Sequence, residues 1–298
     1  MGHIAFLGLG NMGLPMASRL VAAGFEVRGF DPGSAASAHA VQAGLPTASS
    51  VAAAMTGADT VISMLPSGRE VIELYCTGDG AAFPLKRGML AIDCSTIDVE
   101  SCARFHAAAG QAGADALDAP VSGGTVGARD GTLTFMVGGD DPALRRAWPM
   151  LEAMGRKVVH AGPAGSGQIA KLCNNMITGV SMLVVSEALM LAQRLGLEPK
   201  KLFEIAATSS GQCWALTSYA PLPGLVPTAP ANRDYEGGFA SALMLKDLRL
   251  AQQAAGASGA ATPMGALAAA LYALHCGQGS GRLDFSSVIR MFEFGGGK

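Results

Sequence analysis

The sequence predicts an α/β domain followed by an all-α domain, with a long helix joining the two. Up to about residue 160, short apolar runs alternate with helical patterns, and the first run leads into a glycine-rich turn. From Gly165 onward, helical periodicity continues without convincing strands. Because Gly162-Pro163 interrupts the chain where this pattern changes, we expect domains over residues 1–163 and 164–298.

The first apolar run, residues 3–7, is typical of a buried parallel strand. It is followed by Gly8-Leu9-Gly10-Asn11-Met12-Gly13, a helical pattern to about residue 23, and a strand over 26–30 that ends at Asp31. A dinucleotide site in a Rossmann-type domain requires this order. The first glycine makes the turn, the second lets the backbone approach a diphosphate, and the third allows close helix packing. We therefore expect a diphosphate at the helix N-terminus.

Asp31 also bears on which dinucleotide binds. A carboxylate at this position accepts hydrogen bonds from the adenosine ribose hydroxyls and repels a 2′-phosphate. The next residues, Pro32-Gly33-Ser34, bring no arginine to hold that phosphate. The sequence therefore favours NAD over NADP, with a plain helix or turn cap as the structural alternative for Asp31.

Further strands are expected over 60–65, 89–93, 116–121, 133–137 and 157–160. Ligands of open α/β sheets collect at the carboxyl ends of the strands, so Leu65-Pro66, Thr96 and Ser122-Gly123-Gly124 should line one crevice. The Ser122 loop offers a hydroxyl and two backbone N–H groups, which suit a small carboxylate. A simple glycine turn is the alternative.

The second half predicts helices over 166–195, 199–209, 239–257, 263–277 and 285–293. On the first of these, Lys171 and Asn175 lie four residues apart and share one face. An ammonium on a mostly buried helix needs a reason, because burying it unpaired is costly. The bland alternative is that Lys171 reaches solvent and Asn175 caps a neighbour. For Lys246 and Asp247, which fall within a later predicted helix, a solvent-exposed ion pair is one interpretation.

Composition excludes several classes of protein. Half of the residues are apolar, 15% are charged and the net charge is −2 without a basic run, which argues against nucleic acid as a partner. The longest apolar stretch is broken by Asn174, Asn175 and Glu187, so no membrane span is expected. Six scattered cysteines without a C-x-x-C pair favour free thiols in a reducing cytoplasm over disulfides or zinc.

Four motifs together resemble the 3-hydroxyisobutyrate dehydrogenase family of the β-hydroxyacid dehydrogenases over essentially the whole chain. They are Gly8-Leu9-Gly10-Asn11-Met12-Gly13-Leu14-Pro15-Met16, Asp118-Ala119-Pro120-Val121-Ser122-Gly123-Gly124, Gly167-Gln168-Ile169-Ala170-Lys171-Leu172-Cys173-Asn174-Asn175 and Lys246-Asp247-Leu248. The resemblance implies Lys171 as catalytic acid/base, Asn175 beside the substrate, and Ser122, Gly123 and Gly124 at the substrate carboxylate.

The same resemblance implies further contacts. Leu65, Pro66, Thr96 and Lys246 match cofactor contacts of the family, together with Asn11 and Met12 of the glycine loop and Asp31. Asp247 matches a neighbour in the site, and Trp214 and Tyr219 fall in the region that shapes the substrate pocket in related enzymes. Family members form oligomers, so a homodimer or homotetramer is expected, with the long apolar helix buried within the chain or against another subunit. No metal is implied.

The chemistry agrees with this resemblance. Oxidation of an alcohol by NAD requires removal of the hydroxyl proton, and a lysine in a partly desolvated cleft beside the positive nicotinamide can have its pKa lowered toward neutrality. The expected reaction is oxidation of 3-hydroxyisobutyrate to methylmalonate semialdehyde, as in valine degradation. L-serine dehydrogenase and tartronate semialdehyde reductase are the alternatives. Phosphogluconate dehydrogenases are disfavoured because they carry histidine where this chain has Asn174. Imine reductases, which commonly lack lysine at the position of Lys171, and a non-catalytic dinucleotide-binding module are disfavoured by the intact Lys171.

Overall fold

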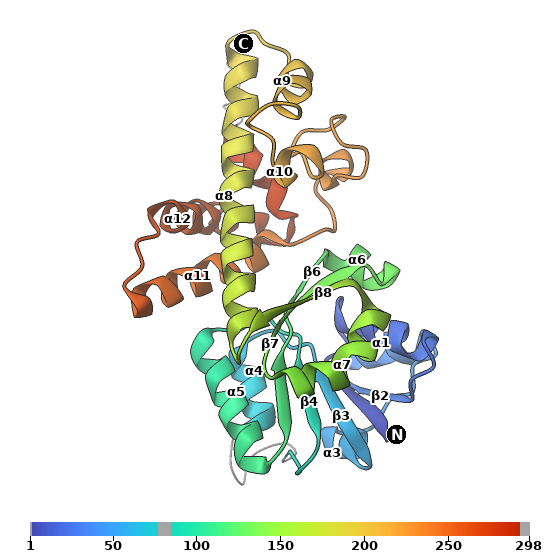
Figure 1. The fold of residues 1–298 in the computed structure, drawn as a ribbon. Coiled ribbons are helices and arrows are strands. Elements are labelled where there is room, and N and C mark those ends of the chain that lie inside the picture. Colours follow the sequence, from blue (N-terminus) through green and yellow to red (C-terminus); the bar gives the residue numbers. More distant parts are fainter. Residues whose placement is uncertain (1, 77–84, 293–298) are drawn as a thin grey trace. The chain divides into compact units, whose positions relative to one another are not determined.

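A computed structural model describes residues 2–76 and 85–292 of the chain. The chain divides into two compact units, Met1–Lys171 and Leu172–Lys298. The first unit is an α/β domain and the second is helical, as Figure 1 shows by the arrows and coils of each part. This confirms the fold class predicted from the sequence. The division falls inside a long helix, whereas the sequence pattern placed it just before that helix, at residue 163.

The sheet of the first unit is built around five parallel strands. Its order is β2-β1-β3-β4-β5-β7-β6, with β8 paired to β7. Strand β7 runs antiparallel to both β5 and β6, and β8 runs parallel to β7. The strands are β1 (His3–Leu7), β2 (Val27–Phe30), β3 (Ala58–Ser63), β4 (Leu90–Asp93), β5 (Asp115–Asp118), β6 (Val121–Ser122), β7 (Leu133–Gly138) and β8 (Gly155–Gly162).

Helices cover both faces of this sheet. They are α1 (Gly13–Ala22), α2 (Ser34–Gln42), α3 (Val51–Met55), α4 (Gly68–Tyr75), α5 (Val99–Ala112), α6 (Gly124–Asp130) and α7 (Asp141–Met154). Alternate residues of β1 point to opposite faces: Phe6 packs in the core with α1 and α7, and Leu7 packs in the core with α3, α4 and α5. Both faces of the central strands are therefore buried, which explains why these strands read as continuous apolar runs.

Helix α8 (Ser166–Arg194) begins in the first unit and continues into the second. The other elements of the second unit are α9 (Pro199–Ala206), α10 (Trp214–Thr217), η2 (Pro230–Arg233), α11 (Ser241–Ser258), α12 (Pro263–Gly277), η3 (Ser280–Arg282) and η4 (Phe285–Met291). Their shared core contains Met182, Leu189, Leu248 and the fully buried Tyr272. The segment predicted as a helix over 285–293 is a 3₁₀-helix, which begins where the Asp284 side chain accepts from Ser286 N.

Helix α8 is long and apolar enough to span a membrane by length and composition alone. In the structure, however, Gln168, Lys171 and Asn175 of this helix are buried polar residues, and Met182 and Leu189 pack into the core of the second unit. These positions pack within the chain, and the length and composition of a single helix are weak evidence for a membrane span.

Candidate active site

The glycine loop after β1 has the geometry that a dinucleotide requires. Gly8 has a φ of 93°, and a Cβ there would lie 2.3 Å from the Met64 carbonyl oxygen. A Cβ at Gly13 would lie 1.8 Å from the Gly8 carbonyl oxygen, so the start of α1 packs directly on the turn. A Cβ at Gly10 would meet no atom within 4 Å. This open backbone is where the diphosphate of a dinucleotide approaches, so the residues present fit NAD.

The N-terminus of α1 is also suited to an anion. Among the residues that the structure describes, α1 has no side-chain cap and no acidic residue in its first turn. Its first N–H groups and the helix dipole are therefore available to an anion without a competing carboxylate in that turn.

Asp31 caps a turn, which is the structural alternative given for it from the sequence, and it also binds the glycine loop. Its Oδ2 accepts a hydrogen bond from Leu9 N at 2.7 Å, and its Oδ1 accepts one from Gly33 N at 2.8 Å. The same carboxylate that is expected to bind the ribose hydroxyls thus also holds the glycine loop in shape. Each oxygen keeps a second lone pair for a ribose hydroxyl.

The carboxyl ends of β3 and β4 bring Leu65, Pro66 and Thr96 to one edge of the sheet, because Ser63 and Asp93 are register partners in these parallel strands. The Leu65 N–H donates to Ser95 Oγ at 2.8 Å. Ser95 Oγ in turn donates to Asp93 Oδ1 at 2.6 Å, and Ser63 Oγ donates to the same oxygen at 2.7 Å.

Burial raises the pKa of Asp93 to about 6, and the hydrogen bonds from Ser95 and Ser63 partly oppose this effect. The Asp93 carboxyl group is fully buried beneath the loop that contains Leu65. It is therefore the structural support of that loop rather than a group that ligands reach.

The Ser122 loop forms where β6 ends. Ser122 pairs with Thr134 of β7, and the chain then turns through Gly123 and Gly124, whose φ angles are 132° and 61°. Both angles lie in the region that favours glycine. A Cβ at Gly124 would meet no atom within 4 Å, so its backbone is accessible to a small ligand.

On α8, Lys171 and Asn175 are both buried, with 7% and 5% of their surfaces exposed. The structure therefore excludes the alternative in which Lys171 extends into solvent. The amide of Asn175 is fixed from two sides: its Nδ2 donates to Asp247 Oδ2 at 2.5 Å, and its Oδ1 accepts from Asn174 Nδ2 at 3.0 Å.

Asp247 on α11 is 2% exposed, and its Oδ1 lies 3.6 Å from Lys246 Nζ. The buried position of Asp247 and its bond to Asn175 exclude a simple solvated pair. Within the described parts of the chain, Asp247 Oδ1 has no hydrogen-bond partner besides this ion pair, so it can accept a further hydrogen bond.

Trp214 and Tyr219 form an aromatic pair in the second unit. Their ring centroids lie 4.7 Å apart in a stacked arrangement, and Tyr219 also stacks on Phe285 at 5.4 Å. The Tyr219 hydroxyl donates to Asp284 Oδ2 at 2.8 Å, which fixes the ring. Half of the Trp214 surface is exposed, so this side chain offers an apolar face on a rigid base.

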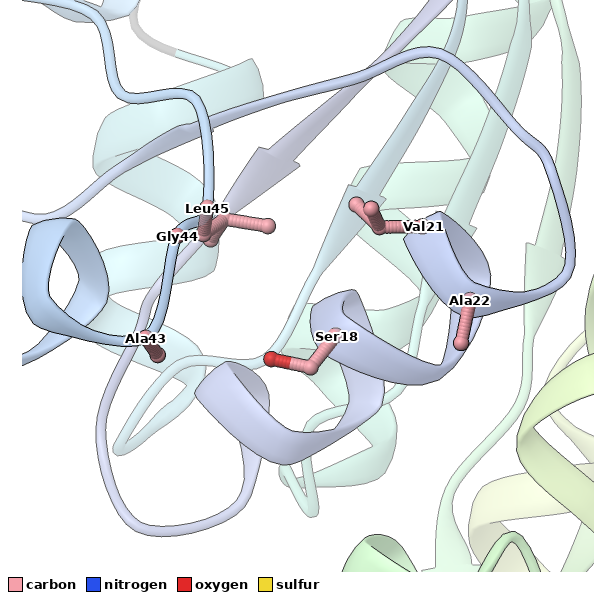
Figure 2. A pocket seen from close by; sticks show the side chains of 6 residues that line it. All are labelled: Ser18, Val21, Ala22, Ala43, Gly44 and Leu45. Atoms are coloured by element: carbon pink, nitrogen blue, oxygen red, sulfur yellow. The ribbon is translucent and has the colours of Figure 1, made fainter.

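A hollow beside the C-terminal half of α1 (Figure 2) is lined by Ser18, Val21, Ala22, Ala43, Gly44 and Leu45. Its one hydroxyl, that of Ser18, donates to Leu14 O at 2.9 Å, so the hollow offers mainly apolar atoms. All six cysteines are free thiols.

Cys102, His106 and Asp118 place possible metal ligands within 4.8 Å of one another. The i, i+4 spacing of Cys102 and His106 on α5 was not singled out from the sequence. Asp118 Oδ1 accepts hydrogen bonds from His106 Nε2 and from Gly165 N, both at 2.8 Å. His106 and Asp118 are thereby explained as part of a hydrogen-bonded structural cluster, and Cys102 belongs to the apolar core.

No role was predicted for Asp118 and Gln168 from the sequence, although both lie within motifs that carry the family resemblance. The Asp118 carboxylate accepts hydrogen bonds from the first turn of α8, and the Gln168 amide bonds to the segment after β4. The signal in the sequence was the amide of Gln168, three residues before Lys171 on a mostly apolar helix, because a polar side chain that becomes buried needs hydrogen-bond partners.

Each half of the chain matches a known protein family. Residues 3–162 match the family described as the NAD binding domain of 6-phosphogluconate dehydrogenase. Residues 165–292 match the family described as the NAD-binding domain of NADP-dependent 3-hydroxyisobutyrate dehydrogenase.

Relatives match over nearly the full chain. An NAD-dependent L-serine dehydrogenase of Pseudomonas aeruginosa is 52% identical, with 98% of each chain covered. A 3-hydroxyisobutyrate dehydrogenase of the same organism is 48% identical over 98% of this chain and 99% of its own. The structure of the Mycobacterium tuberculosis 3-hydroxyisobutyrate dehydrogenase with L-serine matches at 47% identity and a TM-score of 0.92, covering 99% of this chain and 100% of that one.

Both halves of the chain thus match NAD-binding families of dehydrogenases, and the relatives at about half identity are named 3-hydroxyisobutyrate or L-serine dehydrogenases. The chain belongs to the 3-hydroxyisobutyrate dehydrogenase family and is an NAD-dependent oxidoreductase of the hydroxyacid type.

Proposed function

We propose that this enzyme oxidises 3-hydroxyisobutyrate to methylmalonate semialdehyde, with Lys171 as the general acid/base. The observation that carries the proposal is the buried Lys171 on α8, one turn before the doubly fixed amide of Asn175. Acid/base chemistry at a hydroxyl group suits an amine that is held in a mostly buried position.

In the proposed reaction, bound NAD supplies the acceptor for the hydride of the alcohol carbon. Lys171 Nζ accepts the hydroxyl proton as the carbonyl forms, and returns it when the reaction runs in reverse. Asn175 has a second amide N–H besides the one that Asp247 accepts, and this N–H orients the substrate hydroxyl. Because Asn174 and Asp247 hold the amide plane, the donor is in place before the substrate binds.

The carboxylate of the substrate is proposed to bind at the Ser122 loop. Ser122 supplies a hydroxyl group, and the backbone N–H groups around Gly123 and Gly124 supply further donors. Glycine at both positions keeps this backbone free of a Cβ that would separate it from the ligand. This contact explains why a hydroxyacid is preferred over a simple alcohol.

L-serine is the second candidate substrate, because the relative named an NAD-dependent L-serine dehydrogenase is 52% identical. L-serine differs from 3-hydroxyisobutyrate by an ammonium group in place of a methyl group. A change of methyl size in an apolar pocket discriminates by only about 10- to 200-fold. The Oδ1 of the buried Asp247 accepts no hydrogen bond from the described residues and lies 3.6 Å from Lys246 Nζ, so it is a suitable acceptor for an ammonium group, which supports some activity toward L-serine.

The test is NAD⁺ reduction, followed by NADH absorbance, with 3-hydroxyisobutyrate, L-serine and D-glycerate, and the reverse reaction with tartronate semialdehyde. We expect the highest kcat/KM for 3-hydroxyisobutyrate. A higher kcat/KM for L-serine would replace the first substrate by the second. Binding of NAD without turnover of any of the compounds would overturn the proposed function.

A homodimer or homotetramer is part of this proposal. Ile177, Val184 and Leu191 lie seven residues apart on α8 and expose 65%, 50% and 59% of their surfaces. A regular exposed apolar stripe on a long helix is typical of a subunit interface. Sedimentation should show an oligomer at micromolar concentration for the wild type and for Gln193→Glu, an exposed control on the same helix, and a shift toward monomer for Leu191→Glu. A monomeric wild type would contradict it.

We also place the enzyme in the cytoplasm, in the degradation of valine. Six free thiols agree with a reducing compartment. Fractionation of cells that express the chain, with activity measured in each fraction, tests this placement.

A further inference from the structure

The first turn of α8 is held against the sheet by a buried carboxylate. Asp118, the last residue of β5, has no exposed surface. Its Oδ1 accepts a hydrogen bond from Gly165 N at 2.8 Å, and its Oδ2 accepts one from Gln168 N at 2.9 Å. These bonds satisfy N–H groups at the start of the helix and place a negative charge at the positive end of its dipole.

A buried amide holds the same turn from a second direction. Gln168 is also without exposed surface. Its Nε2 donates to Ser95 O at 2.7 Å, and its Oε1 accepts from Ile97 N at 3.1 Å. The side chain therefore satisfies two backbone groups of the segment that follows β4, and either group would be left unpaired if the amide moved.

Two glycines remove the remaining freedom of this turn. A Cβ at Gly167 would lie 2.4 Å from the Met136 carbonyl oxygen, and a Cβ at Gly138 would lie 2.5 Å from Asp118 Oδ1. The backbone of α8 thus touches β5 and β7 directly. A helix in such contact cannot rotate or slide without breaking the hydrogen bonds to Asp118 and Gln168.

The segment that Gln168 holds is the one that supports the expected cofactor contact. Ser95, whose carbonyl group accepts from Gln168, also accepts from Leu65 N through its hydroxyl group at 2.8 Å. Through Ser95, therefore, the start of α8 and the loop of Leu65 are fixed to a common point. Lys171 follows Gln168 by three residues on the same helix, and it lies in the same unit of the chain.

We propose that Asp118 and Gln168 are positioning residues. They fix the rotation of α8 and its position along its own axis, so that Lys171 presents its amine at the reacting hydroxyl. This inference rests on the proposed role of Lys171 as acid/base. Misplacement of a catalytic group by about 1 Å costs on the order of 100-fold in rate. Loss of the Gln168 amide is thus expected to lower kcat about 10- to 100-fold.

The test compares Gln168→Met with Gln168→Glu. Methionine is similar in length and makes neither hydrogen bond, so kcat should be low at every pH. A protonated glutamic acid makes both bonds, because its O–H donates to Ser95 O and its C=O accepts from Ile97 N. The kcat of Gln168→Glu, expressed relative to wild type at the same pH, should therefore rise as the pH is lowered.

Wild type is the reference at each pH because it shares the other ionisable groups of this hydrogen-bonded region, Asp93, Asp118 and His106, with the variant. Gln193→Met, an exposed substitution of the same kind on α8, is the matched control and should leave kcat unchanged. A wild-type kcat for Gln168→Met, or a low relative kcat for Gln168→Glu that does not change with pH, would overturn the positioning role.

Hydrogen exchange of residues 165–171 gives a readout that does not depend on activity. The amides of this turn should exchange faster in Gln168→Met than in wild type and in Gln193→Met. Unchanged exchange would overturn the inference even if the enzyme is active. An inactive wild type combined with faster exchange in the variant would instead reject the proposed function and leave the anchoring of α8 in place.

Discussion

The single substitutions Gly10→Ala and Gly13→Ala test two properties of one loop separately, its cofactor binding and its contribution to folding. At Gly13, a Cβ would lie 1.8 Å from the Gly8 carbonyl oxygen, where real contacts stay beyond 3.0 Å. Helix α1 must move away from the turn, and overpacking of this kind costs about 1–3 kcal/mol. At Gly10, a Cβ meets nothing within 4 Å, so alanine leaves the free energy of unfolding nearly unchanged.

The methyl group of Gly10→Ala nevertheless occupies the space through which the diphosphate approaches the backbone. Hydrogen bonds to a charged group contribute about 1.5–3 kcal/mol, so losing one weakens NAD binding roughly 10- to 100-fold. Thermal unfolding without NAD, together with calorimetric titration with NAD, measures both effects. We expect a wild-type Tm and weak NAD binding for Gly10→Ala, and a lowered Tm for Gly13→Ala. Wild-type NAD affinity in Gly10→Ala would refute the assignment of this loop to the diphosphate.

Three further substitutions test other parts of the molecule. Asp31→Ala should weaken NAD binding and also lower the Tm, because the carboxylate accepts from Leu9 N and Gly33 N; an unchanged Tm in thermal unfolding would contradict its structural role. Folding raises the pKa of Asp93 from 3.8 to about 6. As the pH rises, this carboxyl group therefore ionises in the unfolded chain before it ionises in the folded one. The free energy of unfolding falls between these two pH values, by up to about 3 kcal/mol. Urea unfolding at about pH 4.5 and about pH 7.5 should show this loss in wild type and not in Asp93→Asn, and equal losses would contradict the effect of burial. Asp247→Asn should lower kcat/KM for L-serine about 10-fold more than for 3-hydroxyisobutyrate, since a charged hydrogen bond is lost only with the ammonium substrate; equal losses in steady-state assays would exclude that contact.

The local parts of the fold and site were predictable from the sequence because their signals are local. The strand, glycine turn, helix and Asp31 follow one another within 29 residues, from β1 at His3 to Asp31, and each glycine has its own steric reason. The change from alternating strands and helices to helices alone indicated the second domain. The same holds for Lys171 and Asn175, whose spacing on one helix is a property of the chain itself.

Other features depend on contacts between distant segments. Gln168 meets Ser95 across 73 positions, and Gly165 meets Asp118 across 47. No local pattern carries the identity of such partners, so the sequence indicated a buried helix without indicating what anchors it. The burial of Asp247 was likewise undecidable, because its partner Asn175 lies 72 residues away. The antiparallel pairing of β6 with β7 and the 3₁₀ geometry of η4 also arise from packing rather than from local periodicity.

Lys171 is proposed to transfer the hydroxyl proton of the substrate. The most direct test of this role is kcat for NAD⁺ reduction by Lys171→Ala with saturating 3-hydroxyisobutyrate or L-serine, whichever wild type prefers, with NAD affinity measured on the same sample. Positioned acid/base groups contribute about 10²- to 10⁴-fold, so we predict a kcat lower by at least 100-fold with NAD affinity unchanged. A variant that binds NAD and turns over at a rate near that of wild type would contradict the claim.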